Sequence, residues 1–139
     1  MPTVLEDVAF GPANQGLSPQ QCLHCAEEAL KQVGMLAAAQ KAPFHLSAGQ
    51  KKRVAIAGIL ATNPNIMVLD EPTTFLDPPG RRSLVELLDR LPQSKILVTH
   101  DISFARRLAT RAAFFRDGKI EAEGTVAELA ERFDWADPA

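Results

Sequence analysis

An apolar run that ends in two adjacent carboxylates constrains the fold of this chain more than any other feature. Ile66-Met67-Val68-Leu69 form the run, and Asp70-Glu71-Pro72 follow it. A short continuous apolar run is typical of a strand buried on both faces, as in a parallel sheet. Ligands of open α/β sheets gather where such strands end. The sequence therefore predicts a buried strand over 66–69 with two carboxylates at a ligand-binding edge.

The segments before this strand predict helices. Ser18-Pro19-Gln20-Gln21 combines an N-cap serine, a proline at the first helical position and a glutamine three residues after the serine, which indicates a helix start. Glycine and proline breakers lead us to expect that residues 1–18 are irregular. We further expect a short helix over 35–42 and a longer helix from Ser47 to about Ala61.

The segments after the strand alternate between helical and strand patterns. Leucines at helical spacing predict a helix over 81–91, and the apolar run at 95–99 predicts a second buried strand. A helix over 103–109 precedes two strands, 112–116 and 119–123, which the Asp117-Gly118 turn joins into a hairpin. Thr125 caps a last helix. The fold class is therefore α/β, with a helical subdomain over 1–62 and a parallel-sheet portion with a C-terminal hairpin over 63–139.

Length and composition narrow the functional classes. The 139 residues correspond to one domain, and 46% hydrophobic with 23% charged residues is typical of a folded globular protein. The net charge is −2 without a basic tail, so nucleic acid is not a favoured partner. No apolar run approaches the roughly 20 residues that span a bilayer, and no signal peptide pattern opens the chain. We expect a soluble cytoplasmic protein that reaches a membrane only through a partner.

The segment Leu46-Ser47-Ala48-Gly49-Gln50 contains a capping box, in which Ser47 and Gln50 close a helix start. Lys51, Lys52 and Arg53 follow, although positive charge in a first helical turn opposes the macrodipole. This pattern indicates that an anion lies nearby, bound by backbone N–H groups with Gly49 allowing close approach. The alternative is a solvated basic helix face.

Polar groups also end the two predicted parallel strands. Asp70 and Glu71 suit a magnesium site, in which one carboxylate holds Mg²⁺ and the next polarises an attacking water. Thr99-His100-Asp101 ends the second strand, so we expect His100 at the same sheet edge, where an imidazole can hydrogen-bond a phosphate oxygen or the water. The alternatives are a solvated acidic turn and a structural histidine.

Taken together, these motifs resemble those of ABC transporter nucleotide-binding subunits. Leu46–Gln50 is similar to the signature motif, Val68–Pro72 to Walker B with its glutamate, Phe75-Leu76-Asp77-Pro78 to the D-loop, and Val98–Asp101 to the switch-histidine loop. The resemblance implies ATP and Mg²⁺ as cofactors, with Glu71 and His100 catalytic and Asp70 on the metal. It also implies that Ser47, Ala48, Gly49, Gln50 and Asp77 contact ATP across a dimer of two ATPase subunits.

A narrower resemblance concerns the energy-coupling-factor ATPases of cobalt and nickel importers. Residues 3–12 and 50–58 carry it. It implies transport of metal ions or vitamins, with the chain peripheral on the inner membrane face through a transmembrane subunit. Two residues depart from the family pattern: Ala48 replaces the usual glycine, and Phe75 stands where smaller residues are common.

No Gly-x-x-x-x-Gly-Lys-Ser/Thr loop occurs in the sequence, although the resembled family uses this loop to hold the phosphates of ATP. We therefore expect a partial ABC ATPase domain that is inactive alone. One alternative is a non-catalytic partner that caps ATP held by a complete subunit. Another, an ABC ATPase of DNA repair or translation, is disfavoured because the segment before Ser47 has neither a coiled coil nor a basic arm.

Overall fold

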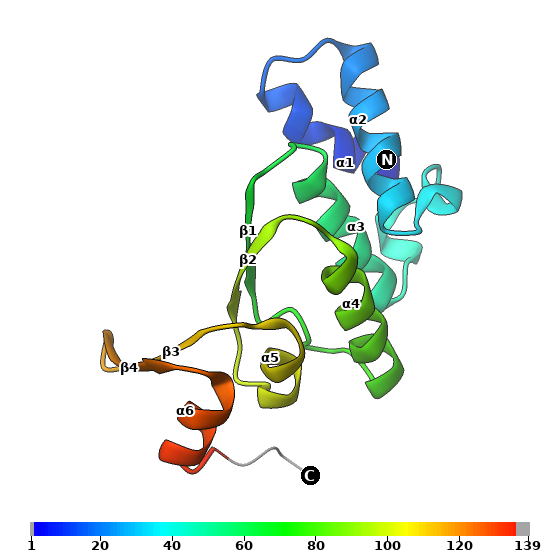
Figure 1. The fold of residues 1–139 in the computed structure, drawn as a ribbon. Coiled ribbons are helices and arrows are strands. Elements are labelled where there is room, and N and C mark those ends of the chain that lie inside the picture. The colour runs from blue at the N-terminus through cyan, green and yellow to red at the C-terminus, as the bar shows by residue number, and fades with distance from the viewer. Residues whose placement is uncertain (1, 136–139) are drawn as a thin grey trace. The chain divides into compact units, whose positions relative to one another are not determined.

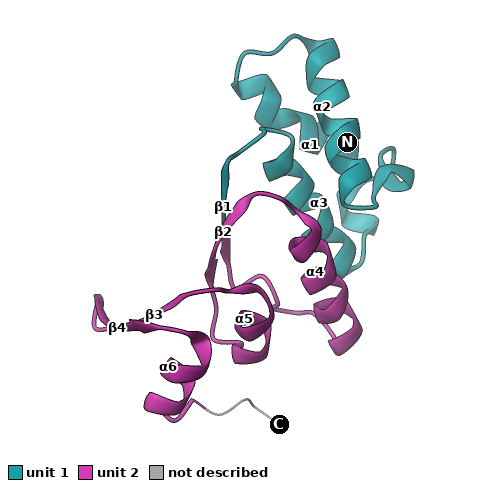
Figure 2. Cartoon of the chain, viewed as in Figure 1, with its two compact units in different colours: residues 1–67 teal, residues 68–139 magenta. Residues whose placement is uncertain are grey.

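The computed structural model describes residues 2–135. The chain divides into two compact units, Met1–Met67 and Val68–Ala139 (Figure 2). Unit 1 is helical, and unit 2 contains most of the strands (Figure 1). Helices thus precede an α/β part, and the order β-α-β-α-β-β-α that the sequence predicts after residue 63 is confirmed.

Three helices form unit 1, namely α1 (Val4–Asn14), α2 (Pro19–Gln32) and α3 (Ala48–Leu60), and all three pack against one another. Two short 3-10 turns, η1 (Leu36–Ala38) and η2 (Pro43–His45), lie between α2 and α3 where the sequence predicted one helix over 35–42. The core contains apolar residues from each helix, with Val8, Leu30 and Ala57 fully buried.

The predicted capping boxes at the starts of α2 and α3 are confirmed. The Ser18 hydroxyl accepts a hydrogen bond from the Gln21 amide, and the Gln21 side chain accepts one from the Ser18 amide. Ser47 and Gln50 exchange the same pair of hydrogen bonds at the start of α3. Gly34 lies just after α2 with φ of 71°, a left-handed conformation that favours glycine.

The prediction that residues 1–18 are irregular is wrong, because α1 occupies most of this segment. Thr3 and Glu6 form a capping box that starts the helix, a local signal that the breakers obscured. Pro12 lies inside α1 and is buried. Gly11 allows the close packing of α1 on α3, since a Cβ at this position would lie 2.6 Å from the Thr62 methyl group. Packing therefore outweighs the poor helix propensity of this segment.

Unit 2 contains two small sheets and three helices. Strand β1 (Ile66–Asp70), which starts at the end of unit 1, pairs in parallel with β2 (Ser94–Val98), and α4 (Pro78–Arg90) connects them. Helix α5 (Ile102–Leu108) follows β2 and packs against α4. Three leucines of α4, at positions 84, 87 and 88, are buried as the helical spacing predicted.

The predicted hairpin is also confirmed. Strands β3 (Ala112–Arg116) and β4 (Lys119–Gly124) pair in antiparallel register, with a bulge between Phe114 and Phe115. Asp117 and Gly118 both have positive φ, as a two-residue hairpin turn requires. Helix α6 (Val126–Arg132) begins at the capping residue Thr125 and packs on both strands.

The burial of β1 and β2 differs from the prediction of strands buried on both faces. Burial alternates along β1, so that Met67 and Leu69 are buried whereas Val68 is exposed. Ile96 and Val98 of β2 are likewise exposed. The prediction fails because, within residues 2–135, the strands form a sheet of only two with one face uncovered.

Candidate functional site

Glu71 lies directly after β1, at the start of a short loop that leads into α4. Its backbone N–H donates a hydrogen bond to the Val98 carbonyl at 2.7 Å, which extends the pairing of the two strands by one residue. Its φ is 43°, a left-handed conformation that costs a non-glycine residue roughly 1–3 kcal/mol. The strand pairing thus holds Glu71 in a strained conformation where its side chain meets the segment after β2.

His100 and Glu71 are brought together as the strand-end argument predicted. His100 Nδ1 lies 2.7 Å from Glu71 Oε1, and the His100 backbone N–H donates to the same oxygen at 3.1 Å. Both residues keep access to solvent, with 76% of the His100 side chain and 34% of the Glu71 side chain exposed. A ligand can therefore reach this pair.

The second carboxylate oxygen of Glu71 has a different environment. Oε2 is buried and has no hydrogen-bond partner among the residues that the structure describes. A buried unpaired acceptor is costly and calls for an explanation, such as a catalytic role or a bound water. Glu71 thus has one oxygen that contacts His100 and one buried oxygen that has no partner among the described residues.

The contact favours one proton arrangement on His100. An ionised carboxylate oxygen only accepts hydrogen bonds, so a hydrogen bond between the two side chains requires the proton on Nδ1. In the neutral ring, Nε2 is then an acceptor, whereas in the protonated ring it is a donor. His100 can therefore donate to a phosphate oxygen through Nε2 only in its protonated form or after the ring turns away from Glu71.

Asp70, the last residue of β1, is exposed. No hydrogen bond or ion pair occupies its carboxylate within residues 2–135, and no group of three or more metal-binding side chains occurs there. Mg²⁺ often binds proteins through one or two carboxylates while phosphates and waters complete its octahedron. A free carboxylate at the strand end fits that requirement, so Asp70 could hold magnesium.

Asp101 is a structural anchor of the site whose role the sequence analysis did not identify. Its carboxylate caps α5 by accepting from the Phe104 amide at 2.9 Å, and it also accepts from the Ser103 hydroxyl. Arg81 of α4 donates to its other oxygen at 3.2 Å. The signal available in the sequence was an aspartate just before a helix. This carboxylate joins the starts of α4 and α5 beside His100.

The environment of Asp101 favours its ionised form. Burial raises its pKa, but hydrogen bonds from Phe104 and Ser103, the charge of Arg81 and a hydrogen bond from Thr73 together lower it below the ordinary value. Thr73 is a buried polar residue of the loop that starts at Glu71. The charged carboxylate thus connects this loop to both helices.

The predicted D-loop residues have separate structural roles. Asp77 caps α4, because its carboxylate accepts from the Gly80 amide at 2.9 Å. Leu76 is buried, whereas Phe75 is 89% exposed with φ of 65°. No contact joins Asp77 to Glu71 or His100 among the described hydrogen bonds.

The predicted signature residues lie in unit 1 at the start of α3. Ser47 is the N-cap, and Ala48, Gly49 and Gln50 form the first turn. A Cβ at Gly49 would meet no atom within 4 Å. Packing within the chain therefore does not require glycine here, although alanine would favour the helix by roughly 0.5–1 kcal/mol.

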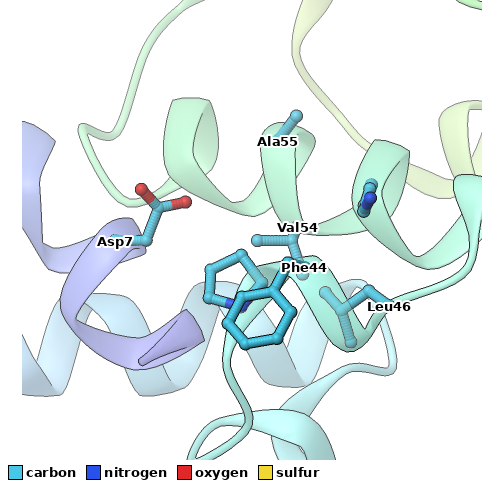
Figure 3. Close-up of a pocket in the computed structure, with 7 residues that line it drawn as sticks. Asp7, Phe44, Leu46, Val54 and Ala55 are labelled. Carbon is cyan, nitrogen blue, oxygen red and sulfur yellow. The ribbon is translucent and has the colours of Figure 1, made fainter. Parts of the chain in front are cut away.

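A shallow pocket of about 300 Å³ lies beside this turn within unit 1. Figure 3 shows the Phe44 ring and the Leu46 and Val54 side chains around it, with Asp7 of α1 at one side. Lys51 also lines it. The pocket is mainly apolar and contains neither Ser47 nor Gly49, so it is a feature distinct from the predicted anion-binding turn.

Comparison with known proteins shows that the sequence of this chain has relatives. The sequence pattern of the family described as "ABC transporter" matches residues 3–74. A putative ABC transporter ATP-binding protein of Streptomyces coelicolor is 47% identical over 129 residues, which cover 93% of this chain and 50% of that protein. The energy-coupling factor transporter ATP-binding protein EcfA of Methanosphaera stadtmanae is 50% identical over 131 residues, with 92% and 47% covered.

Solved structures also resemble the chain. CbiO1 of Clostridium perfringens, described as part of the ABC transporter complex CbiONQ, superimposes with a TM-score of 0.81 at 34% identity, covering 96% of this chain and 55% of CbiO1. A bacterial ABC transporter cassette solved as a dimer gives a TM-score of 0.73 at 34% identity, with 89% and 56% covered. The chain thus spans about half the length of the relatives it matches.

Proposed function

The chain belongs to the ABC transporter family, and on this premise we propose that it forms part of the ATP-hydrolysing subunit of an importer. The observation that carries the proposal is the contact between Glu71 and His100. The carboxylate of a residue with a strained backbone meets an accessible imidazole there, and one buried carboxylate oxygen has no partner among the described residues. Such a pair suits the positioning of a water against a phosphate.

Glu71 is the proposed water-positioning residue. Its carboxylate can accept a hydrogen bond from a water, which aligns the water oxygen with the γ-phosphorus of ATP. His100 is the proposed contact to the γ-phosphate through Nε2. The two roles are coupled, because the proton that Nδ1 shares with Glu71 determines whether Nε2 can donate.

Asp70 is the proposed magnesium residue. Asp70 is exposed and has no partner among the described residues, so its carboxylate is available to the metal or to a metal-bound water. When bound, magnesium would neutralise part of the negative charge on the β- and γ-phosphates. In this proposal Asp70 binds the magnesium ion and Glu71 orients the water.

The first turn of α3 is the proposed contact to ATP held by a second subunit. The first N–H groups of a helix have no intrahelical partner, and the helix dipole favours an anion there. Gly49 supports this role because its missing side chain leaves room that no atom of residues 2–135 fills. Ser47, Ala48 and Gln50 are the other proposed contacts at this helix start, and Asp77 is the proposed D-loop contact.

The proposed partners are a second ATPase subunit and a transmembrane subunit, with the chain on the cytoplasmic face of the membrane. The relatives named EcfA and CbiO1 support an energy-coupling importer, and the proposed cargo is a metal ion such as cobalt or nickel, or a vitamin. No helix within residues 2–135 has the length and apolar character needed to cross a membrane.

We also propose that the 139-residue chain does not hydrolyse ATP by itself, since it contains no Gly-x-x-x-x-Gly-Lys-Ser/Thr loop. The test compares the chain alone with the chain joined to the half of the Streptomyces coelicolor relative that it does not match. Phosphate release should require the joined protein and should fall by about 10²–10⁴-fold in Glu71→Gln.

Three outcomes of this test would contradict the inactivity of the chain alone, contradict the role of Glu71, or favour the alternative function. Magnesium-dependent hydrolysis by the chain alone that Glu71→Gln abolishes would contradict inactivity alone. A joined protein that hydrolyses ATP equally well with Glu71→Gln would contradict the role of Glu71. If the joined protein is inactive but the chain stimulates a complete subunit, the alternative of a non-catalytic partner that caps ATP is favoured.

A further inference from the structure

The Asp101 carboxylate accepts more hydrogen bonds than the start of α5 requires. A helix N-cap needs one acceptor, and here the Phe104 amide donates to it at 2.9 Å. The same oxygen also accepts from the Ser103 hydroxyl at 2.9 Å, and the other oxygen accepts from Arg81 at 3.2 Å. Thr73 adds a further hydrogen bond. The Asp101 side chain is only 10% exposed, so these partners surround a nearly buried charge.

Two of these partners connect Asp101 to the loop over residues 71–77, which joins β1 to α4. Thr73 is a buried residue near the start of this loop. Arg81 reaches the end of the loop, because its Nε atom donates to the Leu76 carbonyl at 3.3 Å while its Nη1 atom donates to Asp101. The Asp101 carboxylate is therefore connected to the loop at two points, near its start directly and at its end through Arg81.

These connections complete a restraint on the contact between Glu71 and His100. On the strand side, the Glu71 N–H donates to the Val98 carbonyl at 2.7 Å. On the loop side, the restraint comes from Asp101, the residue after His100, whose N–H donates to the Thr99 hydroxyl at 3.0 Å. A left-handed backbone such as that of Glu71 persists only where the surrounding structure determines it. Glu71 is thus restrained both by the strand before it and by the loop after it.

We propose that Asp101 is a positioning residue for Glu71. Its carboxylate holds the loop, directly and through Arg81, in the conformation in which the Glu71 carboxylate meets the His100 imidazole. This inference rests on the proposed function only for the statement that the contact serves ATP hydrolysis. The alternative is that Asp101 acts on α5 alone, as an N-cap without an effect on Glu71.

Asparagine at position 101 separates the two roles. Asparagine is as good an N-cap as aspartate, so Asp101→Asn keeps an acceptor for the Phe104 amide while it removes the charge that attracts Arg81. Arg81→Gln removes the same ion pair from the other side, and this variant should fold because the arginine side chain is half exposed. Ser103→Ala is the matched control, since it removes a hydrogen bond from the same carboxylate on the α5 side.

The first measurement uses the chain alone, without nucleotide. Nitrogen-15 spectra at alkaline pH report the ratio of the Nδ1-protonated to the Nε2-protonated neutral ring of His100. We expect Asp101→Asn and Arg81→Gln to lower this ratio by about 2–10-fold, which corresponds to the loss of one hydrogen bond. Ser103→Ala should leave the ratio unchanged. An N-cap that acts on α5 alone would not affect His100, so an unchanged ratio in Asp101→Asn and Arg81→Gln would overturn the proposal.

The second measurement uses the chain joined to the half of the Streptomyces coelicolor relative that it does not match. Asp101→Asn and Arg81→Gln should lower kcat for ATP hydrolysis by about 10–100-fold and leave KM nearly unchanged, because a misplaced Glu71 weakens the transition state rather than ATP binding. Ser103→Ala should retain the wild-type kcat. An equal loss of kcat in Ser103→Ala would assign the effect to α5 and overturn the proposal.

Failure of this inference is distinguishable from failure of the proposed function. A joined protein that hydrolyses ATP equally well with Glu71→Gln, although the His100 ratio shifts as expected, would contradict only the proposed function. A joined protein that Glu71→Gln inactivates but that keeps its kcat in Asp101→Asn would contradict only the positioning role of Asp101.

Discussion

His100 contacts Glu71 twice, through imidazole Nδ1 at 2.7 Å and through its backbone N–H at 3.1 Å, and both contacts fall on the same carboxylate oxygen. The carbonyl oxygen of a glutamine can accept the same two hydrogen bonds. Glu71→Gln should therefore preserve the local structure while removing the charge that polarises a water. Because the hydrogen bonds are kept and only the charge is lost, the substitution tests the role of the charge in hydrolysis rather than in folding.

The first prediction concerns the proton on His100. Nitrogen-15 spectra at alkaline pH should show the neutral ring protonated at Nδ1, because Glu71 Oε1 accepts from that atom. Glu71→Ala should shift His100 toward the Nε2-protonated form. His24 and His45 serve as internal controls and should not change. A His100 ring protonated at Nε2 in the wild-type chain would contradict the contact.

The second prediction compares the two partners in the ion pair between α4 and α5. Asp101→Ala should lower the free energy of unfolding by about 0.5–2 kcal/mol through loss of the α5 cap. Arg81→Ala should lower the free energy of unfolding by only about 0–1 kcal/mol, because the arginine side chain is half exposed. Urea unfolding measures both. Hydrogen exchange at the Phe104 amide should accelerate mainly in Asp101→Ala, and equal acceleration in the two variants would contradict the capping role.

The third prediction concerns the pH dependence of stability. The pKa of Asp101 is lower in the folded chain than in the unfolded one, so its contribution to stability is present above the unfolded pKa and is lost as the pH falls through the folded pKa. The stability difference between wild type and Asp101→Asn should thus be largest near neutral pH and should shrink in acid. Urea titrations over this range measure it, and a difference independent of pH would contradict the assignment.

The fourth prediction separates helix stability from ligand contact in α3. A Cβ at either Gly49 or Gly58 would meet no atom within 4 Å. Gly49→Ala and Gly58→Ala should therefore each raise the free energy of unfolding, by up to about 1 kcal/mol. In the joined protein described above, only Gly49→Ala should reduce ATP hydrolysis. Equal activity of the two variants would argue against a ligand at Gly49.

Local signals accounted for much of the fold. The capping boxes at Ser18 and Ser47 and the Asp117-Gly118 turn satisfy backbone groups within four residues, so the sequence alone predicted where these elements begin or turn. The sequence also contained the Thr3–Glu6 capping box of α1. The prediction for this segment failed because Gly11 and Pro12 are poor helix formers, and packing against α2 and α3 overcomes that preference.

The candidate site was partly predictable. Sequence order placed Glu71 and His100 at the ends of two parallel strands, which meet at one edge of a sheet. The sequence could not determine that both contacts fall on one oxygen or that Glu71 has a left-handed backbone, because residues 71 and 100 meet only through strand pairing. The anchoring by Asp101 and Arg81 depends in the same way on the packing of α4 against α5.

The sequence by itself determined that helices precede an α/β part, that two carboxylates end a strand, and which residues cap the helices. These properties depend on the order of residues and on hydrogen bonds between near neighbours. Only the tertiary structure decided that Val68, Ile96 and Val98 are exposed. An apolar strand residue has the same local pattern whether its face is covered or open, and burial depends on which other elements pack against it.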